Sequence, residues 1–142
     1  MVRYIALLCL FVSGIAGYTT DQFKQDLCIY EYIAIGTVTY FKELNGVSAN
    51  DPSMLGMCSI LSVIFSIILI FIKNKYFYLI GLFVLFSLEL MLLNMMETAS
   101  YKEIIYDSIT KCSNISALCW MIGQVSFLLL SVVYVVKSDD RL

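Results

Sequence analysis

One glutamate inside a long apolar stretch has the clearest capacity for chemistry in this sequence. Glu89 lies in YFYLIGLFVLFSLELMLLNMME, residues 76–97, and its neighbours on both sides are apolar. Ionisable groups are rare in such segments of membrane proteins and usually have a role there. Hydrolysis inside a membrane would need a paired acid, a Ser/His pair or a metal site. The chain has no histidine, so we expect no enzyme activity, no metal site and no cofactor.

Two more polar residues are expected at the depth of Glu89. Counted from the outer ends of their apolar segments, Ser66 and Gln124 lie about as deep, roughly 10–14 Å below the boundary at about 1.5 Å per residue. Facing lipid would cost Glu89 a few kcal/mol. We therefore expect it to face inward as a neutral carboxyl group and to hydrogen-bond to Gln124 or a serine. This layer could be a structural contact, an assembly contact, or a proton- or cation-binding group on a transport path.

The composition is typical of a protein embedded in a bilayer. The 142 residues are 61% hydrophobic and 14% charged, against about 45–50% and about 25% in soluble domains. The mean hydropathy is +0.87 and the sequence pI is near 4.9. Because nucleic-acid binding needs a basic patch, we expect no nucleic-acid partner. The expected partners are the lipid bilayer and other membrane proteins, or further copies of this chain.

Three apolar segments approach the roughly 20 residues that cross a bilayer as a helix. They are residues 57–72, 76–96 and 115–136. The first helix should begin earlier, because Asp51-Pro52 combines an N-cap residue with a proline at the first helical position. We therefore predict a transmembrane helical bundle over residues 57–136, with an inner turn at 73–75 and an outer loop at 97–114.

The N-terminus has two interpretations. Residues 1–17 combine Arg3, a short apolar run, and the small residues Gly14 and Ala16 at the positions that precede a signal-peptidase cut. This pattern is typical of a cleaved secretory signal peptide, which is the interpretation favoured by its short length. The alternative is an uncleaved first helix. Both interpretations place residue 18 and the segment after it on the luminal or extracellular side.

Basic residues define the expected orientation, because they are enriched on the cytosolic side of membrane proteins. The relevant residues are Arg3, Lys73, Lys75, Lys137 and Arg141. A single orientation places all of them inside, with residues 137–142 as a cytosolic tail. Residues 18–56 and 97–114 are then outside, in the secretory pathway, at the cell surface or on a viral envelope.

Both outer loops are predicted to form amphipathic helices. In the first loop, apolar residues recur at spacings of three and four; they are Phe23, Leu27, Tyr30, Ala34, Val38 and Phe41. A strand over residues 33–41 is the alternative. In the second loop, Tyr101, Ile104, Ile105 and Ile109 share one side, and we expect this helix to continue the preceding membrane helix. The apolar faces would lie on lipid or on each other, or would bind a partner.

The cysteines predict at least one disulfide, because the outer loops would face an oxidising compartment. Cys28 and Cys112 lie in the outer loops, and Cys58 lies at the outer mouth of its helix. We favour the pair Cys28–Cys112, with Cys58–Cys112 as the rival. Cys119 is expected to be a small packing residue.

One glycosylation sequon is present, Asn-Ile-Ser beginning at Asn114. On the expected topology it faces the side where glycosylation occurs. It also abuts the membrane, where the glycosyltransferase has poor access, so we expect Asn114 to be unmodified.

Small residues form two stripes that are suited to close helix packing in a membrane. The first contains Ser59, Ser62 and Ser66, and the second contains Ser116, Cys119, Gly123 and Ser126. Both are expected to face the interior of the bundle.

The sequence therefore predicts an all-α integral membrane protein, with a signal peptide or first helix followed by three transmembrane helices. This layout resembles that of claudins and other small tetraspans. The claudin first-loop signature contains tryptophan, whereas Trp120 is the only tryptophan here and lies in the last apolar segment, so we assign no family. The predicted function is that of a small membrane interaction protein: a scaffold, an adhesion component or an accessory subunit. The alternative is a channel or transporter subunit that uses the Glu89 layer.

Overall fold

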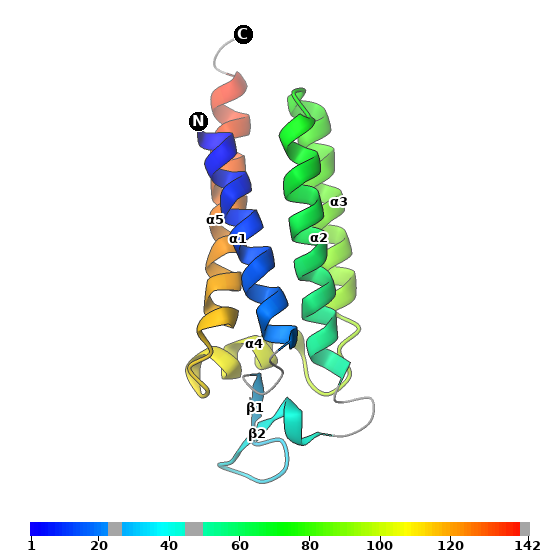
Figure 1. The fold of residues 1–142 in the computed structure, drawn as a ribbon, viewed down its shortest axis with the longest axis vertical. Coiled ribbons are helices and arrows are strands. Elements are labelled where there is room, and N and C mark those ends of the chain that lie inside the picture. Colours follow the sequence, from blue (N-terminus) through cyan, green and yellow to red (C-terminus); the bar gives the residue numbers. More distant parts are fainter. Residues whose placement is uncertain (23–26, 45–49, 140–142) are drawn as a thin grey trace.

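Four long helices form an elongated bundle, and a small cap closes one end of it (Figure 1). The computed structural model describes residues 1–22, 27–44 and 50–139. The long helices are α1 (Val2–Gln22), α2 (Asp51–Phe71), α3 (Lys75–Leu93) and α5 (Ile115–Asp139). Each of the four is long and apolar enough to cross a membrane. The predicted helical architecture is confirmed, with the three predicted long helices and a fourth at the N-terminus. Helix α2 begins earlier than its apolar segment, as predicted, but the N-cap position is Asn50, and Asp51 is the first helical residue.

The two ends of the bundle hold different parts of the chain. The start of α1, the end of α5 and the turn between α2 and α3 lie at one end, the turn end, with Arg3, Lys73, Lys75 and Lys137 (Figure 1). The loops between α1 and α2 and between α3 and α5 lie at the other end, the cap end. Arg141 falls outside the described residues.

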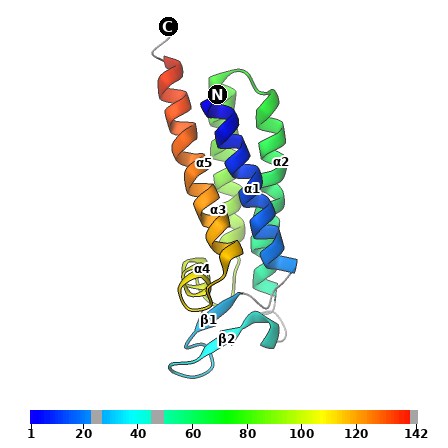
Figure 2. The same ribbon diagram turned by 60° about the vertical axis from the view of Figure 1, so that its left-hand side comes forward.

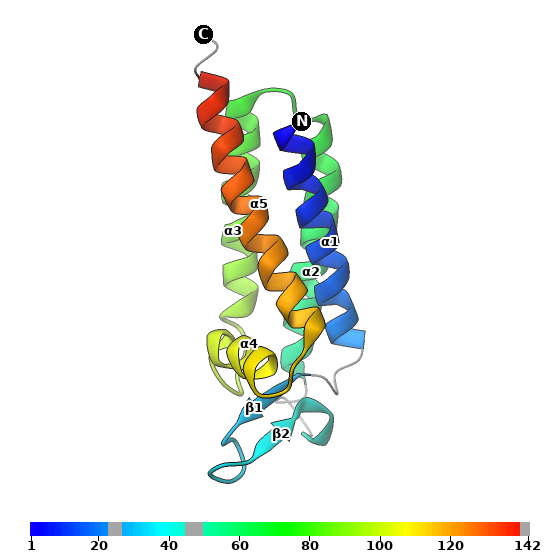
Figure 3. The ribbon, with the colours of Figure 1, turned by 90° about the vertical axis from the view of Figure 1, so that its left-hand side faces the viewer.

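Helix α1 packs along both α2 and α5, whereas α3 packs mainly on α2 (Figure 3). Gly14 explains the close approach of α1 to α2, since a Cβ atom there would lie 2.7 Å from the backbone oxygen of Ser59. A hydrogen bond of 2.8 Å from Ser13 Oγ to the Trp120 carbonyl joins α1 to α5. The first helix is thus an integral part of this bundle.

The cap contains a β-hairpin, which corrects the predicted amphipathic helix. Strands β1 (Cys28–Tyr30) and β2 (Val38–Tyr40) pair antiparallel, with Cys28 opposite Tyr40, and a 3₁₀ turn η2 (Phe41–Glu43) follows. The alternative prediction, a strand over residues 33–41, agrees with the structure at β2, which lies within that range. Phe23, the first residue of the predicted helix, lies outside the described residues.

Contacts with helix α4 (Tyr101–Thr110) explain why this segment is extended. The Ser108 hydroxyl accepts a hydrogen bond from the Cys28 amide at 3.1 Å and donates one to the Cys28 carbonyl. The Tyr30 amide donates to Asp107 Oδ2 at 2.9 Å. These bonds to β1 come from a helix about eighty residues away in the chain, so the local spacing of apolar residues could not reveal them.

The second outer loop is helical as predicted, but α4 does not continue α3. Helix α3 ends at Leu93, and α4 begins afresh after Ser100, whose hydroxyl accepts a hydrogen bond from the Glu103 amide. Between them, the buried carboxylate of Asp51 accepts hydrogen bonds from the Glu97 and Thr98 amides. This contact explains why the chain turns back over α2 instead of extending α3.

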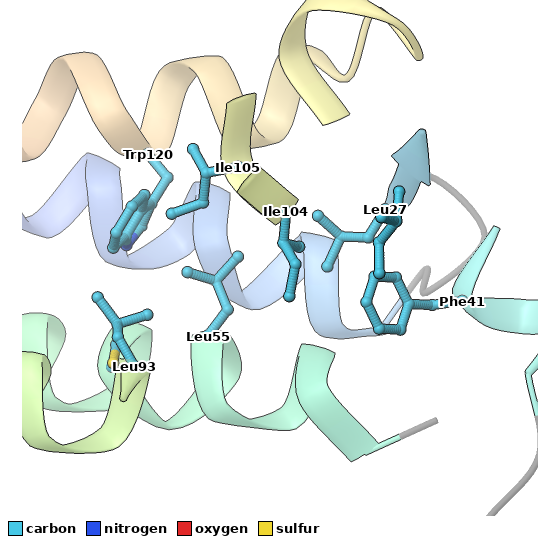
Figure 4. Close-up of a cluster of buried hydrophobic side chains, with 9 residues drawn as sticks. Leu27, Phe41, Leu55, Leu93, Ile104, Ile105 and Trp120 are labelled. Carbon is cyan, nitrogen blue, oxygen red and sulfur yellow. The ribbon is translucent and has the colours of Figure 1, made fainter. Parts of the chain in front are cut away.

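The predicted disulfide between Cys28 and Cys112 is confirmed, and it joins β1 to the end of α4. Cys58 is buried and free. An apolar cluster beneath the hairpin includes Leu27, Phe41 and Ile104, and it continues into the bundle through Leu55 and Trp120 (Figure 4). The cap is therefore bound to the bundle by a covalent bond, by hydrogen bonds and by a shared apolar core.

Candidate functional site

Three polar side chains meet inside the bundle and form one hydrogen-bonded network. Glu89 Oε1 accepts hydrogen bonds from Ser62 Oγ at 2.6 Å and from Gln124 Nε2 at 3.2 Å. Gln124 Nε2 also donates to Ser62 Oγ at 2.8 Å. The three residues come from α3, α2 and α5, so the network joins three of the four long helices. We call Ser62, Glu89 and Gln124 the buried triad.

The surroundings of the buried triad are closed to solvent. Glu89 is 4% exposed and Gln124 is 8% exposed. Cys58 lies on α2, one helical turn before Ser62. Its thiol donates a weak hydrogen bond of 3.6 Å to the backbone carbonyl of Glu89. Within the described part of the chain, both side-chain donors to the Glu89 carboxyl group are neutral.

The predicted polar layer thus contains Glu89 and Gln124, with Ser62 in the place expected for Ser66. Ser66 is buried, but its hydroxyl donates to the Val63 carbonyl of its own helix at 2.7 Å. Ser62 and Ser66 lie one helical turn apart on the same face of α2. Counting residues from the helix ends therefore identifies the correct face of α2. The serine that it selects, Ser66, lies one helical turn from Ser62, which contacts Glu89.

One hydrogen-bond acceptor of the buried triad has no donor among the described residues. It is Gln124 Oε1, which is buried. Glu89 is the titratable group of the triad: as a neutral carboxyl group it can donate one hydrogen bond, whereas a carboxylate can only accept.

The buried triad consists of one carboxyl group, one amide and one hydroxyl group. No group of three or more His, Cys, Asp or Glu residues that could hold a metal ion occurs in the parts of the chain that the structure describes. The single hydroxyl hydrogen of Ser62 is shared between Glu89 Oε1 and the Cys58 carbonyl, which lies 3.0 Å from Ser62 Oγ, and the same oxygen accepts a hydrogen bond from Gln124. Hydroxyl groups arranged in this way stabilise helix contacts.

The small-residue stripes contribute unequally to packing. Ser59 is buried against α1, Gly123 packs on Ser13 of α1, and Ser116 Oγ lies 3.3 Å from Thr19 Oγ1. Ser126 is half-buried. Cys119, in contrast, is exposed and does not pack in the interior as expected. The buried face of α5 is shifted by one residue from that stripe, and it includes Ala117, Trp120, Gln124, Phe127 and Ser131.

Arg3 forms a second cluster, at the turn end, which sequence reasoning missed. Its guanidinium group donates to the Leu69 carbonyl and, at 2.7 Å, to the Ile70 carbonyl, near the end of α2. It also lies 5.7 Å from the ring centroid of Tyr78 and 6.0 Å from that of Tyr134, within cation–π range. A cation is favourable at a helix C-terminus. Arg3 therefore links α1 to α2, α3 and α5, whereas the sequence indicated only a basic residue at the inner end of a signal peptide or first helix.

The side chain of Asn114 is used inside the protein. It is 4% exposed, and its Oδ1 accepts a hydrogen bond from the Ala117 amide at 2.8 Å. This is an N-cap contact at the start of α5. Its Nδ2 is buried without a partner among the described residues. The buried amide supports the expectation that Asn114 is unmodified.

Substitution of Asn114 by alanine should lower the free energy of unfolding by about 1 kcal/mol, because it removes the N-cap acceptor. Asn114→Asp should lose less stability than the alanine variant. Its carboxylate retains the acceptor and suits the positive end of the helix dipole, and the cost of burying the charge offsets part of this gain. Unfolding in mixed micelles, followed by Trp120 fluorescence, measures both variants. Equal losses for alanine and aspartate would contradict the N-cap assignment.

Comparisons of the chain with protein-family models, with curated proteins and with solved structures gave no match.

Proposed function

We propose that the chain is a four-span membrane protein in which α1 is retained as the first span. The support is the position of α1, which packs on both α2 and α5. Ser13 and Arg3 also make polar contacts with those neighbouring helices. Cleavage after Ala16 would remove these contacts and expose buried side chains of the neighbours. N-terminal sequencing of the purified protein tests this step: retention predicts a start at Met1 or Val2, whereas a start at Gly17 contradicts it.

We propose further that the turn end faces the cytosol and the cap end faces the lumen or the exterior. The basic residues of the turn end support this orientation through the positive-inside rule. The Cys28–Cys112 disulfide also favours an oxidising compartment for the cap end. The protein would then belong to the secretory pathway, the cell surface or a viral envelope.

Within this architecture, we propose that the protein is an interaction protein: a scaffold, an adhesion component or an accessory subunit of a membrane complex. This proposal is supported by where the polar groups of the bundle and the disulfide of the cap lie. Inside the bundle, the buried triad bonds to itself. The cap holds a disulfide-bonded surface outside the long helices. A cap held in a fixed shape on an anchored bundle is suited to binding.

Release of the cap tests this function. The double variant Cys28→Ser/Cys112→Ser should keep the helical bundle, whereas the hairpin loses its covalent bond to α4. Proteins that co-purify with the wild type in a gentle detergent should fall about tenfold in yield, as quantified by mass spectrometry; tenfold corresponds to about 1.4 kcal/mol. Cys119→Ser serves as the matched control, because Cys119 is exposed and free. Equal yields for the wild type and the double variant would contradict binding through the cap.

A second candidate function is proton or cation transport as a subunit of a channel or transporter. The buried Glu89 carboxyl group favours it, because this is a titratable group inside the bundle, and Gln124 Oε1 has no partner among the described residues. The Glu89→Gln variant separates the two candidates. Transport predicts a flux that this variant abolishes, whereas a structural role predicts no flux in either protein.

A further inference from the structure

The tip of the hairpin presents apolar side chains that no part of the described chain covers. Residues 31–37 are all exposed, and Ile33 and Ile35 are 70% and 92% exposed. No charged residue occurs between Glu31 and Lys42. Exposed apolar residues that are contiguous at a surface often mark a binding site. The tip is therefore a candidate contact surface.

The protein holds this tip in a defined position. Three register pairs, from Cys28–Tyr40 to Tyr30–Val38, advance the strands roughly 7 Å from the start of β1, at about 3.3 Å per residue. The Glu31 amide donates to the Thr37 carbonyl at 2.7 Å, and Gly36 has a φ of 82° that suits the turn. The bonds of β1 to α4 fix the other end. The tip is thus organised before it meets a partner.

The direction of the hairpin determines which surface it can reach. In three views turned about the long axis, the hairpin extends past α4, away from the long helices (Figures 1, 2 and 3). If the four helices span a bilayer, as proposed above, the tip points away from that bilayer. A second surface on the same side is the one that it can contact.

The chemistry behind the tip fits a lipid surface. Tyr32 is at the tip, and the rings of Tyr30 and Tyr40 lie on the strands behind it. Lys111 Nζ lies 4.6 Å from the Tyr30 ring centroid, and Lys42 Nζ lies 5.2 Å from that of Tyr40. From the tip toward the bundle, the order is apolar residues, then tyrosines, then lysines. A bilayer presents its acyl chains, its interface and its headgroup phosphates in the same order from the centre outward. Glu31 is also exposed, so the expected anchor is apolar more than electrostatic.

We propose that residues 32–36 insert into the interfacial region of a second bilayer that faces the one holding the four helices, an inference that rests on the proposed function. Ile33 and Ile35 enter the apolar layer. Tyr32 lies at the headgroup boundary. The protein would then hold two lipid surfaces together.

Vesicle flotation of the full-length protein in nanodiscs tests this proposal, because a nanodisc leaves both ends of the bundle accessible. Wild-type nanodiscs should float with phosphatidylcholine vesicles, whereas protein-free nanodiscs should not. Ile33→Ser/Ile35→Ser should lower the vesicle affinity by about tenfold for each isoleucine, hence about a hundredfold. Lys42→Gln should reduce only the additional binding that phosphatidylserine in the vesicles provides.

Ile115→Ser is the matched control, since Ile115 is 74% exposed at the cap end but lies off the hairpin. It should bind vesicles like the wild type. Trp120 fluorescence and an intact disulfide establish that the double serine variant is folded. Absence of wild-type flotation, or equal affinities for the wild type and the double serine variant, overturns the lipid contact. If protein partners then still depend on the Cys28–Cys112 disulfide, the proposed function stands and a protein docks at the cap.

Discussion

Glu89→Leu should lower the free energy of unfolding by about 2 kcal/mol. Leucine fills a similar volume but accepts no hydrogen bond, so one N–H of Gln124 loses its acceptor, whereas Ser62 Oγ keeps the Cys58 carbonyl at 3.0 Å. A buried polar group that loses its partner costs about 1–3 kcal/mol, and the better apolar transfer of leucine offsets part of this cost. Reversible unfolding in mixed micelles, with the single Trp120 as the fluorescent probe, measures the change.

Glu89→Gln is the control for this prediction. The glutamine side chain has nearly the same shape and keeps an acceptor for Ser62 and Gln124. Its free energy of unfolding should lie within about 1 kcal/mol of the wild type. A large loss for glutamine, or none for leucine, would contradict the structural role of the buried triad.

Gly123→Ala should lower the free energy of unfolding by about 2 kcal/mol, through overpacking between α1 and α5. The added Cβ atom would lie 2.6 Å from Ser13 Cβ and 3.0 Å from the Cys9 carbonyl oxygen. Neither atom is at the end of a flexible side chain, so the two helix backbones must separate. The separation would also lengthen the hydrogen bond from Ser13 to the Trp120 carbonyl.

Gly81→Ala is the matched control, because the same change meets a movable neighbour. Its Cβ atom would lie 2.7 Å from Leu69 Cδ2, which a rotamer change can displace. Alanine also favours a helix over glycine by about 1 kcal/mol. Gly81→Ala should therefore be neutral or stabilising in the same micelle unfolding assay. Equal losses for the two variants would mean that close packing of α1 on α5 is not what Gly123 provides.

The long helices were predictable because their apolar segments approach membrane-span length, and that signal depends on composition alone. The Cys28–Cys112 pair was also predictable, since both residues lie in segments assigned to the same side. Glu89 and Gln124 could be matched by depth. The serine could not be chosen, because Ser62 and Ser66 differ by one turn and the helix register is fixed by contacts such as Cys58 to the Glu89 carbonyl.

The hairpin and the role of Arg3 were beyond sequence reasoning for a different reason. Apolar residues at spacings of three and four fit a helix over residues 23–41, but Ser108 and Asp107 bind the backbone of β1 in an extended form. Arg3 forms its bonds near the end of a helix that lies more than sixty residues away in the chain. Both features depend on tertiary contacts that no local pattern encodes.

The most direct test of the account is proton flux into liposomes that contain the wild-type protein or Glu89→Gln. A pH-sensitive dye inside the liposomes reports the flux, and protein-free liposomes give the baseline. The account predicts that both proteins match the baseline, because the buried triad holds α2, α3 and α5 together without conducting. A wild-type flux above the baseline that disappears in Glu89→Gln, while Trp120 fluorescence shows a folded protein, would contradict it.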